Sequence, residues 1–168
     1  MKKLILTFII STGATLLTSA QIQSMTGPRL GLTLIGAGET ADILTDDDNG
    51  PSAITTQYGW QWESRFADGG DITGLAEWVV LLGGVERGKF LPSISSLIGF
   101  RSREGFEMGV GPNLTLGGLG MVFGVGFTAT NGKLNMPINI VFSPSKEYSW
   151  IESGPSLSIL VGFNIASK

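Results

Sequence analysis

The chain has 168 residues, a formal net charge of −3, and neither cysteine nor histidine. Without cysteine there can be no disulfide framework and no lipid-modified cysteine anchor, and without histidine the commonest general base and the commonest zinc ligand are both missing. These absences argue against most hydrolytic chemistry. We therefore expect a protein that is not an enzyme and that uses no catalytic residue, no metal and no cofactor.

The N-terminus has the three parts of a secretory signal peptide. Two lysines precede an apolar run, Leu4–Leu17, and a triplet of small residues ending at Ala20 follows it. The run holds about fourteen residues, whereas a membrane-spanning helix needs roughly 20, so the spanning helix is the weaker alternative. We predict a signal peptide over residues 1–20 and one exported domain over residues 21–168. Without the two lysines, nine basic residues face fourteen acidic ones, which argues against nucleic acid as a partner.

Eight segments in which apolar and polar residues alternate follow in the chain, each bounded by turn residues. We predict strands over Arg29–Ala37, Ile54–Phe66, Ile72–Gly83, Phe90–Arg101, Phe106–Leu116, Leu119–Thr130, Leu134–Phe142 and Ser156–Ile165. Successive side chains of a strand point to opposite sides, so nearly every segment has one apolar face and one face of small, polar or charged residues. The strand at Ile72–Gly83 is the least regular, because Val79 and Leu81 join Glu77 on the face opposite Trp78.

The strand predicted over Ile54–Phe66 alternates most strictly. Its aromatic side chains share one face, and Gln57, Gln61, Glu63 and Arg65 share the other. A soluble sheet would turn the tryptophans of this strand toward a core, whereas a transmembrane strand would turn them toward lipid. This strand alone leaves both interpretations open.

The connections between the predicted strands alternate in length. Tight turns lie at residues 67–71, 102–105 and 130–133, and two long loops lie at Gly38–Ser52 and Ser143–Gly154. Short periplasmic turns, longer extracellular loops, an even number of strands and about ten residues per strand are typical of outer-membrane barrels. Lipid offers no partner for an open sheet edge. We therefore predict an all-β fold, an eight-stranded antiparallel up-and-down transmembrane β-barrel.

The pattern resembles the small eight-stranded outer-membrane barrels of Gram-negative bacteria, the OmpA, OmpX and OmpW-like group. The run PSISSLIGFRSREGFEMGVGPNLTL, Pro92–Leu116, also resembles exported barrel proteins of Bacteroidota. The resemblance implies a location in the cell outer membrane, with outer-membrane lipid and the barrel-insertion machinery as partners and a monomeric state. Enzymes of this architecture typically rely on a histidine, which this chain lacks. One departure is the C-terminus, because such barrels usually end on an aromatic residue, whereas here Phe163 is followed by NIASK.

Two motifs partly match the sequence patterns of nucleotide-binding loops. Gly36–Ala41 matches a dinucleotide fingerprint, but the residues after it show no helical period, so we interpret it as a glycine-rich exit from a strand. Gly83–Lys89 approaches a phosphate-binding loop, but Phe90 stands where a serine or threonine belongs and Pro92 would block the helix. We predict a simple connection between strands there.

The acidic run Asp46–Gly50 suggests a calcium loop. In that alignment Thr45 and Thr56 stand at the first and last ligand positions, where acids belong, so we predict a solvated loop. Prolines raise a separate question about register, since Pro92, Pro112 and Pro137 fall inside predicted strands and cannot donate to a ladder. Each is expected at a bulge or near the membrane rim.

The face opposite the apolar one carries six charged residues, which we predict to form a charge network in the lumen: Arg29, Glu63, Arg65, Glu77, Arg101 and Glu107. Ionised groups in a narrow interior have to be paired and hydrogen-bonded. The favoured interpretation is a polar plug that fills the barrel and fixes its register. A gated, narrow pore is the alternative.

The apolar face carries the aromatic side chains that we predict to face lipid: Tyr58, Trp60, Trp62, Phe66, Trp78, Phe100, Phe106, Phe127 and Phe163. Its five phenylalanines are expected to form one girdle at the periplasmic boundary. The leading hypothesis is a small integral outer-membrane protein with a structural or surface-interaction role through its long loops. The second is a soluble exported barrel that binds an apolar ligand as lipocalins do, with its apolar face turned inward.

Overall fold

The computed structural model describes residues 24–45, 52–132, 134–146 and 152–166. The strands are β1 (Ser24–Gly36), β2 (Ser52–Asp68), β3 (Ile72–Gly83), β4 (Leu91–Ser102), β5 (Phe106–Thr115), β6 (Gly118–Asn131), β7 (Leu134–Ser143), β8 (Ser156–Gly162) and β9 (Asn164–Ala166), with a helix α2 (Glu39–Thr45) and a 3-10 helix η1 (Val85–Arg87). The predicted signal peptide, the acidic run at residues 46–50 and the middle of the second long loop lie outside these described residues. No helix in the described part of the chain is long and apolar enough to cross a membrane.

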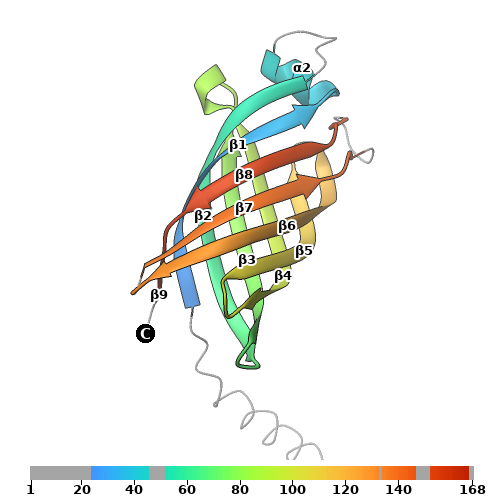
Figure 1. Ribbon diagram of the computed structural model, residues 1–168. Coiled ribbons are helices and arrows are strands. Elements are labelled where there is room, and N and C mark those ends of the chain that lie inside the picture. Colours follow the sequence, from blue (N-terminus) through green and yellow to red (C-terminus); the bar gives the residue numbers. More distant parts are fainter. Residues whose placement is uncertain (1–23, 46–51, 133, 147–151, 167–168) are drawn as a thin grey trace, which may run out of the picture.

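Antiparallel pairing of neighbours closes the sheet into a barrel (Figure 1). Each strand from β2 to β8 pairs with the one before it, and β1 pairs with both β2 and β8. The short β9 continues the line of β8 between β7 and β1, so the two together fill the eighth position. The prediction of an all-β, eight-stranded antiparallel up-and-down barrel is confirmed.

The barrel has two different ends. At the end that we call the turn end, the β2–β3, β4–β5 and β6–β7 connections are tight, and Gly105 (φ 96°) and Gly132 (φ 63°) take up the left-handed conformation that such turns require. At the opposite end, which we call the loop end, lie α2, η1 and the connection from β7 to β8. Figure 1 shows α2 above the strands at that end and the tight turns below.

The prolines interrupt hydrogen bonding without shifting the register of the strands. This corrects the expectation that each proline lies at a bulge or near the membrane rim. Pro92 does lie near the loop end as the second residue of β4. The β4–β5 ladder, however, skips Pro112 and resumes in the same register. Pro137 on β7 and Pro28 on β1 lie on the two sides of the break between β8 and β9. The break occurs there because neither proline can donate a hydrogen bond to the ladder. Among the ladders of the described residues, a register shift occurs in the β2–β3 ladder, where Phe66 is the extra residue.

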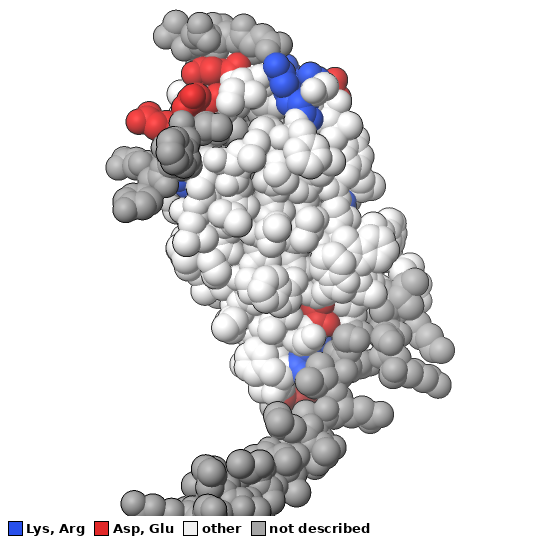
Figure 2. All heavy atoms as spheres, turned by 180° about the vertical axis from the view of Figure 1, so that it is seen from behind, with Lys and Arg blue, Asp and Glu red and all other residues white. Residues whose placement is uncertain are grey.

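The exterior between the two ends is apolar. Leu32 is 56% exposed, Trp62 48% and Ile98 65%, and apolar side chains of every barrel strand from β1 to β8 share this outward direction. Figure 2 shows charged side chains gathered toward the two ends of one face, with a broad uncharged band between them. Soluble monomers rarely expose contiguous apolar patches larger than a few hundred Å². This surface therefore requires an apolar environment.

Helix α2 corrects the expectation that no helix follows Gly38. The helix is only 7 residues long, and it buries Ala41 and Leu44 against Ile35 and Ala53 at the loop end. Two buried positions three residues apart are too few to produce a recognisable helical period. Glu39 and Asp42 place two carboxylates in its first turn, where they would repel a pyrophosphate group.

Candidate functional site

The turn-end half of the lumen holds a cluster of buried charges centred on Arg101. Its guanidinium donates to both carboxylate oxygens of Glu63, from Nη1 at 2.8 Å and from Nη2 at 2.5 Å, and its Nε donates to Glu107 Oε1 at 2.5 Å. Thr128 Oγ1 donates to the same Glu107 oxygen, and Asn139 Nδ2 donates to the other at 3.4 Å. These contacts join β2, β4, β5, β6 and β7 across the lumen.

The other three charges predicted for the lumen lie around this cluster with different contacts. Arg29 is 1% exposed and donates from Nε to Gln61 Oε1 at 2.9 Å and from Nη1 to the Pro28 carbonyl at 2.9 Å. Arg65 approaches Glu63 at 4.0 Å, with 26% of its side chain exposed. Glu77 lines a cavity of about 60 Å³ beside the cluster. The structure thus joins Arg101 to Glu63 and Glu107 by short charged hydrogen bonds, and it holds Arg29 through neutral acceptors.

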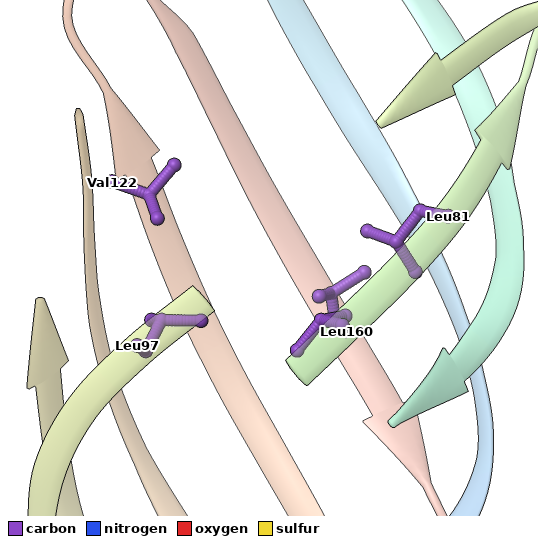
Figure 3. Close-up of a cluster of buried hydrophobic side chains, with 5 residues drawn as sticks. Leu81, Leu97, Val122 and Leu160 are labelled. Carbon is purple, nitrogen blue, oxygen red and sulfur yellow. The ribbon is translucent and has the colours of Figure 1, made fainter. Parts of the chain in front are cut away.

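An apolar layer crosses the lumen above these charges. It consists of Val79, Leu81, Leu97, Val122 and Leu160, all buried, with Val141 packed against them. Figure 3 shows the labelled members of this layer, Leu81, Leu97, Val122 and Leu160, pointing into the enclosed space from different strands. Sequence reasoning placed Val79 and Leu81 inside but missed the other three.

Beyond the apolar layer, the loop-end half of the lumen contains a cavity of about 100 Å³. Hydroxyl and amide side chains dominate the polar part of its lining: Thr33, Thr40, Thr55, Gln57, Ser93, Ser95, Asn113, Thr115, Ser143, Ser153, Ser156 and Ser158. Lys146 enters it from the start of the β7–β8 connection, three residues after the end of β7, and is 8% exposed. No periodic signal marks Lys146 in the sequence, because it lies outside the strands.

The aromatic side chains predicted to face lipid all point away from the lumen. The exposed set contains Tyr58, Trp60, Trp62, Phe66, Trp78, Phe100, Phe106, Phe127 and Phe163. Trp60 Nε1 donates to Thr26 Oγ1 on the neighbouring strand at 2.5 Å, so the indole N–H is satisfied within the protein. A Cβ added to Gly74 would come within 2.9 Å of the Phe66 ring, so that ring lies close to the β3 backbone at the bulge.

Within the four described segments, no group of three acidic side chains is arranged to hold a metal ion. A closed eight-stranded barrel, an apolar exterior and an interior of buried polar and charged residues together define an outer-membrane β-barrel.

Comparison with known proteins bears on the fold. The chain is similar to the crystal structure of Neisserial surface protein A (NspA), with a TM-score of 0.50 and 12% identity over 85% of this chain and 97% of that one. It also matches Ail, the attachment invasion locus protein of Yersinia pestis, with a TM-score of 0.28 and 11% identity over 85% of this chain and 99% of that one. No family model and no curated protein matches the sequence. At this identity, the likeness to NspA shows the small outer-membrane barrel fold alone.

Proposed function

We propose that this chain is a non-catalytic integral protein of the outer membrane, with a structural or surface-interaction role at its loop end and a lumen filled by its own side chains. The observation that carries the proposal is the division of the molecule into an apolar exterior and an interior of buried polar and charged side chains. We propose that lipid covers the exterior and that the protein is a monomer. We also propose that a signal peptide over residues 1–20 directs its export and that the barrel-insertion machinery delivers it to the membrane.

The loop end offers a braced platform for interaction. Glu86 of η1 accepts hydrogen bonds from the Thr56 amide at 2.9 Å and from Thr55 Oγ1 at 2.8 Å. The neighbouring Arg87 donates to the carbonyls of Leu44 at 3.2 Å and Ile54 at 3.4 Å, which ties η1 to both α2 and β2. A braced end loses little conformational entropy on binding, which favours a surface-interaction role.

The two alternatives are a lipocalin-like barrel and a narrow pore. A lipocalin-like barrel would turn its apolar face inward, but Leu32, Trp62 and Ile98 face outward while Arg29 and Glu63 are buried, so that hypothesis is wrong. A narrow pore would need a continuous polar path. The apolar layer around Leu97 opposes such a path and supports the filled lumen.

Tryptophan quenching tests the orientation of the barrel. Trp150 lies outside the described residues, so we would replace it with phenylalanine and leave Trp60, Trp62 and Trp78 as reporters. In vesicles, brominated lipid should quench their blue-shifted emission, because all three side chains face outward. Heat-modifiable migration on a denaturing gel would first confirm that the barrel has folded. Quenching by aqueous iodide with no effect of brominated lipid would contradict the proposal.

A further inference from the structure

Lys146 is the cation of the loop-end cavity, and its bonding partners are neutral. Its Nζ donates to Asn113 Oδ1 at 2.6 Å and to Thr115 Oγ1 at 3.0 Å. Backbone hydrogen bonds in both directions between Lys146 and Ser153 hold it at the mouth of the barrel. No carboxylate of the described residues lines the cavity. Burial lowers the pKa of the Lys146 ammonium group from its ordinary value, as expected for a cation without a counter-ion beside it.

The hydrogen bonds of Asn113 fix which groups remain available. An ammonium group can only donate, so the amide oxygen of Asn113 must face Lys146 and the amide nitrogen must face the opposite way. That nitrogen donates to Ser93 Oγ at 2.8 Å and to Ser95 Oγ at 2.9 Å. Since both serine oxygens act as acceptors here, each hydroxyl still has its own proton to donate.

Three donors are therefore left over among Lys146 and the two serines that flank Asn113. The ammonium group carries three N–H bonds and uses two of them on Asn113 and Thr115, and Ser93 and Ser95 contribute one O–H each. Thr115 does not add a fourth, because its hydroxyl donates to the Gly118 carbonyl at 3.4 Å. The cavity volume of about 100 Å³ leaves room for several waters or one small ligand.

We propose that this loop-end cavity binds a small oxyanion of the phosphate or sulfate class, held by Lys146, Ser93 and Ser95. A surplus of donors around one buried cation matches a ligand that carries negative charge and only accepts hydrogen bonds. Leu81, Val122 and Leu160 of the apolar layer line both cavities and lie between Lys146 and the turn-end charges, and Ser95 reaches the smaller cavity as well. The site goes beyond the proposed function and does not depend on it.

Gly120 provides a way to disturb the site without changing its charges. A Cβ at this position would lie 2.6 Å from Cε of Lys146 and 3.1 Å from both its Cδ and Cγ. The missing side chain therefore makes room for the lysine stem along β6. Gly124 on the same strand is a matched control, because a Cβ there would meet its nearest neighbour, Val141, at 3.8 Å, an ordinary contact.

The test is a titration of the folded, detergent-solubilised full chain with inorganic phosphate at constant ionic strength in chloride buffer, followed by the ³¹P linewidth. Wild type and Gly124→Ala should show the same saturable binding, and sulfate should compete. Lys146→Met should weaken binding at least tenfold, because it removes the charged donor of the site. Gly120→Val should weaken it as well, because its side chain displaces the lysine.

Each variant would first be checked for heat-modifiable migration, so that a loss of binding is measured on folded barrels. Linewidths that never saturate in wild type, or binding by Lys146→Met as tight as in wild type, would overturn the proposal. Both outcomes leave the membrane orientation and the filled lumen untouched, since those are tested by lipid quenching and by conductance.

Discussion

The two halves of the lumen bury their charged side chains against different kinds of partner. At the turn end, Arg101 meets two carboxylates directly, and each Glu63 oxygen receives its own hydrogen bond. At the loop end, Lys146 rests on an amide and a hydroxyl, beside a cavity of about 100 Å³. The first half is filled by its own counter-charges, whereas the second leaves donors facing open space.

This difference separates a structural role from a binding role. A buried ion pair costs desolvation that its own hydrogen bonds must offset, and once these are complete the pair has nothing left for a ligand. A buried cation whose hydrogen-bond partners are neutral still lacks a counter-ion. The apolar layer of Val79, Leu81, Leu97, Val122 and Leu160 keeps the two halves apart.

The largest effect is expected from Arg101→Met. The substitution leaves Glu107 buried without a cation beside it and leaves Glu63 with only the more distant Arg65, at 4.0 Å, so it should lower the free energy of unfolding by about 4 kcal/mol. Urea unfolding in detergent, followed by tryptophan fluorescence, measures the loss. Arg103→Met is the matched control two residues away, because Arg103 pairs with Asp71 on the surface with 72% of its side chain exposed and should contribute less than about 1 kcal/mol.

A triple variant sharpens this result. Arg101→Met combined with Glu63→Gln and Glu107→Gln removes the two orphaned charges together with the arginine and should recover much of the lost stability. If the triple variant were no more stable than Arg101→Met alone, charge pairing would not be what holds the turn end together.

A smaller effect is expected in the apolar layer. Leu97→Ala removes a buried side chain from the middle of the lumen and should cost about 2–3 kcal/mol through the cavity it leaves. The adjacent Ile98→Ala is the control, since Ile98 is 65% exposed on the outer face and should cost less than about 1 kcal/mol in lipid. Equal losses in unfolding experiments would mean that the layer is not packed as described.

The smallest effect is expected at the loop end, in Glu86→Gln. Hydrogen bonds, first of all from the Thr56 hydroxyl, lower the pKa of the Glu86 carboxyl from about 4.5 to about 2. A lowered carboxyl pKa contributes stability that is complete above pH 4.5 and is lost as the pH falls through about 2. Because the group is exposed, the variant should lose less than about 1 kcal/mol at pH 7. The difference from wild type should shrink toward pH 2, and a difference that grows on acidification would contradict this assignment.

The sequence was sufficient for the barrel because strand alternation is a local property. Seven of the eight strands lie close to their predicted bounds, whereas β1 begins at Ser24, five residues before the predicted start at Arg29. Alternation also assigns the outward Trp62 and the inward Glu63 to the faces on which they lie. The apolar layer was also within reach. Leu97 alternates with the inward-facing Ser95 and Gly99, and Val122 alternates with Gly120 and Gly124. Single apolar residues are easily overlooked on a face whose other members are small and polar.

The remaining features depend on contacts between distant segments, which no local pattern contains. Lys146 reaches Asn113 across 33 residues of sequence, and Arg101 reaches Glu63 across 38. Helix α2 forms because Leu44 finds a buried site against Ile35 and Ala53, not because of its helical propensity. The uninterrupted register at Pro112 likewise follows from pairing on both sides of the gap.

Ionic conductance in planar lipid bilayers tests most directly the central claim that this barrel closes its own lumen. Folded wild-type protein, whose insertion is verified by protection of the barrel from protease, should give no steady current under conditions where a general diffusion porin gives clear channel steps. The apolar layer and the Arg101 cluster both lie across the path of an ion. Large, steady, reproducible conductance steps from the wild-type barrel would contradict the filled lumen and establish the pore in its place.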